Sequence, residues 1–410
     1  MPHPVWKTAL SIAGLQALGA CQMVLPTTGA GGIAQGGPDV GSLIGLVGEA
    51  VGGQGLASPR PVSLSPLVSP SRSPMPLTTP AVAGGAASSG PAGIVTTLAG
   101  DGTRAHKDET GTEAWFKETS GLALAPNGTL YVADTGNHRI RKVTPDGAVT
   151  TLAGAAAEGY EDGAGSAARF RSPEGLALAL DGTLYVADSG NHRIRAVTRD
   201  GVVTTLAGST QGYADGPGAA AKFNTPLGLA LAPDGSLYVA DSSNHRLRKV
   251  GRGGVVSTLA GSTGGYVDGD VATAKFKGVH GLAVASDGTL YVADYLNQRI
   301  RKVAPDGTVT TLAGSTKGNA DGPGAAAQFN FPAALALAPD GTVYVADALN
   351  HRLRKVTPAG VVSTLAGSMR GFWDATGAAA KFAVPQGLAL APNGTLYVAD
   401  RDNYRIRLVR

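Results

Sequence analysis

Cysteine is almost absent from this chain, since Cys21 is the only one among 410 residues. One thiol can form neither an intrachain disulfide nor a cysteine-rich metal site, so burial of apolar surface must stabilise the fold. Aromatic residues make up only 5%, and the sequence carries no phosphate-cradling glycine loop and no nucleophile–base–acid motif. Glycine is abundant, with 60 residues, which suits tight turns and closely packed strands.

The chain is built from an internal repeat. The phrase VTTLAG or VSTLAG recurs six times, beginning at Val95, Val149, Val203, Val256, Val309 and Val362. The phrase YVAD keeps the same spacing, beginning at Tyr131, Tyr185, Tyr238, Tyr291, Tyr344 and Tyr397. Units of 53 or 54 residues at this regularity indicate an array of supersecondary units.

Each unit is predicted to contain four short antiparallel strands. In one unit these are residues 121–126, 129–134, 139–144 and 148–154. Asn127-Gly128 and Asp146-Gly147 lie between strands and are typical hairpin dipeptides. Four antiparallel strands per repeat predict the blade of a β-propeller, so the fold class is all-β.

The two ends of the array predict ring closure. Residues 94–100 are a lone fourth strand, whereas residues 387–410 stop after a third strand. One end therefore supplies the strand that the other lacks, which removes two free strand edges. We expect a six-bladed propeller over residues 94–410, closed by strand 94–100 in the last blade.

The repeat resembles the NHL family of six-bladed propellers. Residues 228–250, GLALAPDGSLYVADSSNHRLRKV, carry the pattern, and the Asn-His signature stands at Asn137-His138, Asn191-His192, Asn244-His245 and Asn350-His351. Two units depart from it, with Asn297-Gln298 and Asn403-Tyr404. The resemblance implies the fold; members of the family serve as protein-binding, RNA-binding and sensor domains, and some propeller enzymes lie near it.

The first 93 residues differ in character. Lys7 precedes the apolar stretch 9–20, which is too short to span a bilayer and has the size of a secretory h-region. Leu18-Gly19-Ala20-Cys21 resembles a bacterial lipobox, so we expect a signal peptide over 1–21 and lipidation of Cys21. Residues 22–93 are rich in Gly, Ser and Pro and are predicted to be a disordered linker. We therefore expect an exported protein, either an outer-membrane lipoprotein or a secreted or periplasmic one.

Residue types present in every unit are expected to serve packing and turns. The Asp that ends each YVAD, such as Asp134, is expected to bond the following turn and the arginine five residues on, Arg139. The four signature histidines are given a structural role as well. Six of the eight phenylalanines share one position in the links between units and are expected to be buried plugs beside a short helix: Phe116, Phe170, Phe223, Phe276, Phe329 and Phe382.

Positions that differ between units are the candidates for ligand binding. Before the expected inner strand stand Ser120, Glu174, Leu227, His280, Ala333 and Gln386. From the face that carries the long links we select Trp115, Tyr160, Glu174, Tyr213, Tyr266, His280, Tyr295, Trp373, Gln386 and Arg401. Variation on one face of a regular scaffold is typical of a binding module. We expect a protein, peptide or glycan ligand, no catalytic residue, no cofactor or metal, and a monomer attached to membranes only through its lipid.

Two alternatives remain open. A hydrolase, lactonase or lyase would need acids or histidines in the channel to hold a metal. The inner strands read LALA or LAVA without such residues, so only Glu174 and His280 at the rim could cooperate. Polyanion binding would need a basic face, but residues 94–410 carry 31 basic and 28 acidic side chains. Their arginines are expected to form a solvated, ion-paired rim, and no nucleic-acid partner is expected.

Overall fold

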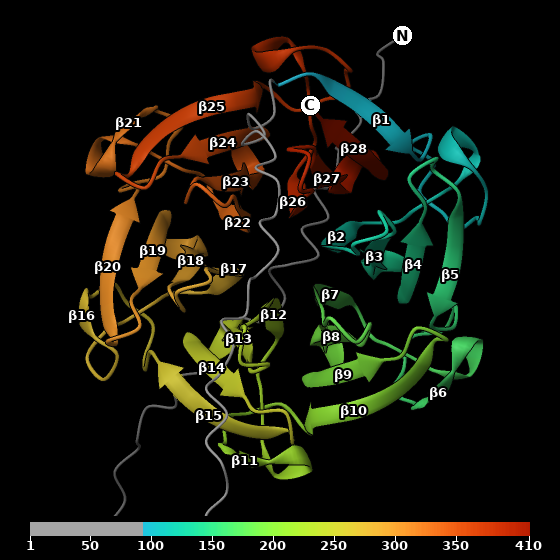
Figure 1. Cartoon of the computed structure of the whole chain (residues 1–410), viewed down its shortest axis with the longest axis horizontal. Helices are drawn as coiled ribbons and strands as arrows, with labels where there is room; N and C mark the ends of the chain where they lie inside the picture. Colours follow the sequence, from blue (N-terminus) through green and yellow to red (C-terminus); the bar gives the residue numbers. More distant parts are fainter. Residues whose placement is uncertain (1–92) are drawn as a thin grey trace, which may run out of the picture. The chain divides into compact units, whose positions relative to one another are not determined.

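The computed structural model describes residues 93–410, which form a ring of six β-sheets (Figure 1). The expected all-β, six-bladed propeller is confirmed. The predicted signal peptide, Cys21 and the linker lie outside the described residues.

Each blade has four main strands, ordered from the channel to the rim. The inner strands are β2 (Thr119–Leu124), β7 (Pro173–Leu178), β12 (Pro226–Leu231), β17 (Val279–Val284), β22 (Pro332–Leu337) and β26 (Pro385–Leu390). The second strands are β3 (Leu130–Asp134), β8 (Leu184–Asp188), β13 (Leu237–Asp241), β18 (Leu290–Asp294), β23 (Val343–Asp347) and β27 (Leu396–Asp400). The third strands are β4 (Arg139–Val143), β9 (Arg193–Val197), β14 (Arg246–Val250), β19 (Arg299–Val303), β24 (Arg352–Val356) and β28 (Arg405–Val409). The outer strands are β5 (Val149–Ala153), β10 (Val202–Gly208), β15 (Val255–Ala260), β20 (Thr308–Ala313), β25 (Val361–Gly367) and β1 (Val95–Ala99).

Short elements occupy the connections. Four sheets gain a two-residue outermost strand from the preceding link: β6 (Gly163–Ala164), β11 (Gly216–Pro217), β16 (Gly269–Asp270) and β21 (Gly322–Pro323). The links carry the 3-10 turns η1 (Gly111–Glu113), η3 (Gly165–Ala167), η5 (Gly218–Ala220), η8 (Gly324–Ala326) and η10 (Gly377–Ala379). Between the second and third strands lie η2 (Thr135–Asn137), η4 (Ser189–Asn191), η6 (Ser242–Asn244), η7 (Tyr295–Asn297), η9 (Ala348–Asn350) and η11 (Arg401–Asn403).

The ring closes as expected through its first described strand. β1 pairs antiparallel with β28, from Val95 opposite Val409 to Ala99 opposite Ile406. Both Val95 and Ala99 are buried. The last blade is therefore completed by a segment from the start of the array, visible where the blue and red strands meet in Figure 1.

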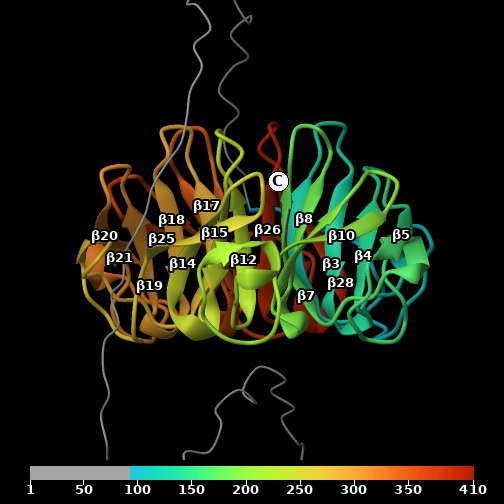
Figure 2. The same cartoon turned by 90° about the horizontal axis from the view of Figure 1, so that it is seen from below.

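The two faces of the ring differ. Figure 2 shows the ring edge-on, with tight hairpins at one face and the links with their 3-10 turns at the other. Gly128 and Gly147 in the hairpins have φ values of +84° and +91°, a conformation that glycine adopts without strain. We call the second face, which carries the links and the turns η2, η4, η6, η7, η9 and η11, the long-loop face.

The apolar core lies between blades. Six buried clusters each combine side chains of two neighbouring blades with one link phenylalanine. All six link phenylalanines have 0% exposed surface, which confirms them as plugs. Propeller stability here therefore comes from the contacts between blades.

A buried ion-pair network repeats in every blade and corrects two expectations. Asp134 accepts a hydrogen bond from Arg141, seven residues on, at 2.6 Å, instead of from Arg139. Arg141 also contacts Asp108 of the link at 2.5 Å and is fully buried. The same arrangement recurs with Arg195, Arg248, Arg301, Arg354 and Arg407. One arginine of each third strand is thus a core residue and no part of a solvated rim.

The signature histidines join neighbouring blades. His138 adopts a left-handed conformation (φ +56°), and its Nδ1 accepts the backbone N–H of Ser172 in the next blade at 3.2 Å. His192, His245 and His351 make the same contact, and Gln298 makes it through Oε1 at 2.6 Å. The expected structural role of this set is therefore visible as a hydrogen bond between neighbouring blades. It occurs at five of the six boundaries between blades, which we call seams.

Candidate functional site

The inner strands begin two residues earlier than expected, and this changes the channel wall. β7 starts at Pro173 and β17 at Val279, so Glu174 and His280 lie within the strands. Gln386 lies within β26 in the same way. The expectation that the inner strands carry no acid or histidine is therefore wrong at their long-loop end.

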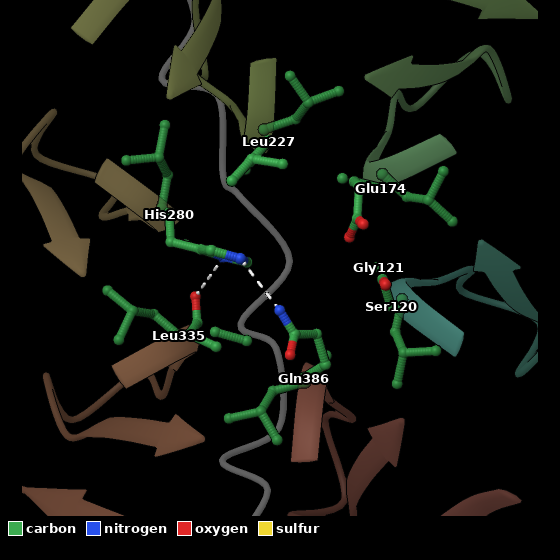
Figure 3. Close-up of a pocket in the computed structure, with 18 residues that line it drawn as sticks. Ser120, Gly121, Glu174, Leu227, His280, Leu335 and Gln386 are labelled. Carbon is green, nitrogen blue, oxygen red and sulfur yellow. Dashed lines mark hydrogen bonds between the residues drawn. The ribbon is translucent and has the colours of Figure 1, made fainter. Parts of the chain in front are cut away.

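These side chains meet in one cavity at the long-loop end of the channel. It has a volume of about 170 Å³, close to that of an engineered cavity that holds one benzene ring. Its wall is formed by equivalent positions of all six inner strands: Ser120, Glu174, Leu227, His280, Ala333 and Gln386 (Figure 3). We call this cavity the channel mouth.

Small residues make the channel mouth narrow. A Cβ at Gly121 would overlap the carbonyl oxygen of Glu174 in the next blade, and a Cβ at Gly281 would overlap that of Ala333. Gly175, Gly228 and Gly387 have the same relation to their neighbours. The inner strands thus approach so closely that the six variable side chains converge.

His280 is fixed in the channel mouth by two hydrogen bonds. Its Nδ1 lies 3.0 Å from the carbonyl oxygen of Ala333, which can only accept, so Nδ1 carries the proton. Its Nε2 lies 3.0 Å from Nε2 of Gln386, two blades away. The neutral ring therefore accepts the amide N–H of Gln386 (Figure 3). Burial, together with the charge of Arg401, lowers the pKa of His280 to about 4, so the ring is neutral at physiological pH.

An aromatic group supports this histidine. The ring of Tyr295 in η7 stacks on His280, with centroids 5.0 Å apart and planes at 26°. The ring of Phe331 lies in turn against that of Tyr295, with centroids 4.8 Å apart and planes at 40°. Stacked aromatic pairs at such distances are favourable, so the imidazole is held in one orientation.

Glu174 faces His280 across the channel mouth (Figure 3). Burial raises the pKa of Glu174, while the charge of Arg401 and a hydrogen bond from the Ser120 hydroxyl lower it. Ser120 in turn accepts a hydrogen bond from Thr135 at 2.9 Å. A half-buried carboxylate among polar groups in a cavity is a typical mark of a binding or reaction site.

Arg401 lies at the one seam that lacks the hydrogen bond made elsewhere by histidine or Gln298. Tyr404 replaces the histidine there, and Glu118 takes the place that Ser172 holds in the second blade. Glu118 forms ion pairs with Arg104 at 2.5 Å and with Arg401 at 3.7 Å. These ion pairs hold the guanidinium of Arg401 near Glu174, where its charge acts on the carboxyl group.

Three of the ten candidate residues, Glu174, His280 and Gln386, line the channel mouth. Two more lie behind them, since Tyr295 stacks on His280 and the charge of Arg401 acts on Glu174. The other five are distributed over the blades. Tyr160, Tyr213 and Tyr266 each cover an arginine of their own blade, at 3.7–3.9 Å from ring centroid to guanidinium, and donate to or accept from a threonine hydroxyl. Trp115 donates to Asp101 at 3.0 Å, and Trp373 is 62% exposed.

Three residues near the channel mouth were not among the candidates. Ser120 stands at the position before the expected inner strand that differs between blades, but a serine there does not by itself indicate a binding residue. Glu118 and Phe331 occupy one repeat position with positive φ, which holds Ser172 and Thr225 in other blades. The change of residue type at that position is the signal that would have identified both.

Residues 93–410 contain no group of three His, Cys, Asp or Glu side chains placed to hold a metal ion. In the same part of the chain, no helix is long and apolar enough to cross a membrane.

Sequence comparison places the repeats in a known family. The NHL repeat matches residues 118–143, 223–250, 276–303, 329–356 and 382–407, and the Teneurin NHL domain matches 138–198. NHL repeat-containing protein 2 of Bos taurus is 31% identical over 331 residues, which cover 68% of this chain and 44% of that protein. Teneurin-m of Drosophila melanogaster is 32% identical over 339 residues, covering 70% of this chain and 12% of that protein. The chain thus spans less than half the length of either relative.

A solved structure has the same fold. The auxiliary nutrient binding protein of Bacteroides thetaiotaomicron superimposes with a TM-score of 0.61 at 18% identity, covering 77% of this chain and 76% of that one. Identity at this level shows the fold alone. With repeat matches in five of the six blades and a ring closed by β1, the chain is an NHL-repeat six-bladed β-propeller.

Proposed function

We propose that this propeller is a recognition module that binds its ligand on the long-loop face, over the channel mouth. One observation carries the proposal: the six-fold repeat is broken where Ser120, Glu174, His280 and Gln386 converge on one cavity. Residues that every blade shares are used for packing and ion pairs. The side chains that differ are therefore free to define a ligand.

The size of the channel mouth indicates how a ligand would bind. A volume of about 170 Å³ lies below the 300–1,000 Å³ of pockets that enclose drug-sized molecules. A protein, peptide or glycan would therefore insert one small group and rest the remainder on the long-loop face. Leu296 and Leu349 on that face are 42% and 40% exposed and offer apolar contact.

The test compares one substitution type on two faces. In the full chain with Cys21→Ser, which removes the proposed lipid anchor from all samples, Leu296→Asp with Leu349→Asp changes the long-loop face. Leu180→Asp, at a 98% exposed hairpin leucine, is the matched control. We expect saturable binding to the cell-envelope fraction in wild type and in the control, with loss in the long-loop variant. Binding kept by the long-loop variant would contradict the proposal. Protease or glycosidase treatment of the fraction then tells protein from glycan ligands.

We further propose that the protein is displayed at the cell envelope through lipidated Cys21. The lipobox-like residues 18–21 support this, since acyl chains anchor a protein through buried methylenes at about 0.8 kcal/mol each. In Cys21→Ser cells, the protein is expected in the soluble fraction. Recovery of that variant with the membranes would contradict the anchor.

A metal-dependent hydrolase, lactonase or lyase is the second candidate, because Glu174 and His280 line the same cavity. A metal that binds only the folded protein, at a free concentration of 100 times its dissociation constant, would stabilise the protein by about 2.7 kcal/mol. Melting temperatures in EDTA and in excess Ca²⁺ or Zn²⁺ test this. A rise with metal that Glu174→Gln abolishes would favour the enzyme, whereas equal values would favour the recognition module.

A further inference from the structure

The channel mouth presents hydrogen-bond acceptors with no matching donors. His280 uses Nδ1 on the carbonyl oxygen of Ala333, and its Nε2 accepts the N–H of Gln386. This fixes the Gln386 carboxamide so that Oε1 is left without a partner among residues 93–410. In the same part of the chain, the Ser120 hydroxyl is the one hydrogen-bonding group that lowers the pKa of the Glu174 carboxyl.

The nearby positive charge forms its ion pair with a different carboxylate. Arg401 lies close enough to act on both Glu174 and His280, but its guanidinium forms an ion pair with Glu118 at 3.7 Å. Within residues 93–410, Glu174 makes no ion pair of its own. The side chain that a ligand would meet in the channel mouth is therefore an unpaired carboxylate.

Part of the channel mouth is apolar. Leu227 lines the cavity between Glu174 and His280, and the stacked ring of Tyr295 covers His280. Leu296 and Leu349, in the turns of the fourth and fifth blades, are exposed on the same face. A ligand group that enters here thus meets both hydrogen-bond acceptors and apolar atoms.

We propose that the channel mouth binds a primary ammonium group on a short apolar stem, as a lysine side chain presents it. Glu174 is the counter-ion, Gln386 Oε1 accepts a second N–H, and Leu227 with Tyr295 contacts the stem. Charge-assisted hydrogen bonds of this kind are the strong ones, and an ammonium group offers three donors. This inference rests on the proposed function and specifies the group that the ligand inserts.

The experiment uses n-butylammonium as the probe, with n-butanol and butyrate as neutral and anionic counterparts. Binding to the full chain is followed by NMR through the ring signals of His280 and Tyr295. The variants are Glu174→Gln, which keeps the shape, and the matched Glu158→Gln, which changes an exposed carboxylate of the link between the first two blades. We expect saturable butylammonium binding, weakened by about 10- to 100-fold in Glu174→Gln and unchanged in Glu158→Gln.

Four results would overturn the inference. Butanol or butyrate binding as tightly as butylammonium would show that the carboxylate does not select the ligand. Equal binding by Glu174→Gln and wild type would place the ammonium elsewhere, and glucosamine binding more tightly than butylammonium would contradict the apolar stem. If none of the probes binds while Leu296→Asp with Leu349→Asp still abolishes envelope binding, the inference fails and the proposed function stands.

Discussion

His138 Nδ1 accepts the backbone N–H of Ser172 at 3.2 Å, and so ties the first blade to the second. A ring nitrogen that accepts a hydrogen bond must be unprotonated. Gln298 performs the same task in the fourth blade with an amide oxygen that does not titrate. The chain thus contains its own pH-insensitive substitute for the seam histidine.

The seam histidines make folding stability depend on pH. Burial lowers the pKa of His138, His192, His245 and His351 below the ordinary 6.5. The unfolded chain then binds protons more readily than the folded one. The contribution of these histidines to the free energy of unfolding is therefore complete above pH 6.5 and is lost as the pH falls below 6.5. Each histidine contributes up to about 1.4 kcal/mol to the free energy of unfolding per unit of pKa shift, and less where solvent screens its charge.

A variant with all four histidines changed to Gln isolates this effect. Its melting temperature should fall less than that of wild type between about pH 7.5 and 5. The buried strand-end aspartates, whose pKa values burial raises, act in the opposite direction but are common to both proteins. Parallel melting curves over this range would contradict the role of the seam histidines.

Truncation of a link phenylalanine should open a cavity between two blades. Phe223 has no exposed surface, so Phe223→Ala is expected to lower the free energy of unfolding by about 3–5 kcal/mol. Phe372→Ala is the matched control, since Phe372 is 42% exposed and stacks on Arg405 at 3.8 Å. A loss of about 1 kcal/mol is expected there. Denaturant unfolding that gives both variants the same loss would argue against the plug.

The buried arginine is expected to matter far more than its exposed neighbour. Arg248→Ala leaves Asp241 buried without its charged partner at 2.7 Å, which should cost about 3–5 kcal/mol of unfolding free energy. Lys249, the next residue, forms an exposed ion pair with Asp234 at 3.3 Å. Lys249→Ala should cost about 1 kcal/mol or less. Similar losses in chemical denaturation would contradict the buried network.

Ring closure is tested by deletion of residues 94–100. This removes β1 and exposes the edge of β28. We expect a lower melting temperature and self-association in sedimentation velocity, because free strand edges pair with other chains. An unchanged melting temperature with a monomeric boundary would contradict closure by β1.

The sequence predicted the ring but not the pairing inside it. Repeat spacing and hairpin dipeptides were sufficient for six blades and for closure. Asp134 stands opposite Arg139 in the strand register, yet its ion pair is with Arg141. The two arginines lie on the same side of the strand, so side-chain alternation could not distinguish them.

The channel mouth was predictable only in part. Glu174, His280 and Gln386 were found because they break a repeated position. The hydrogen bond between His280 and Gln386 joins residues 106 apart, which meet only once the ring has closed. Tyr160, Tyr213 and Tyr266 were selected from the face that carries the long links, but their rings cover arginines of their own blade.

The central claim is that repeated residues hold the ring and that the residues breaking the repeat bind the ligand. A symmetrised variant tests it directly: Glu174→Leu and His280→Leu with Ser120→Ala and Gln386→Ala, using residue types that the third and fifth blades carry at this position. The measurement is its binding to the cell-envelope fraction, made with Cys21→Ser in both proteins so that no lipid contributes, with the melting temperature taken on the same sample. We expect binding to be lost while the protein still melts as a folded ring. Undiminished binding by this variant would contradict the account.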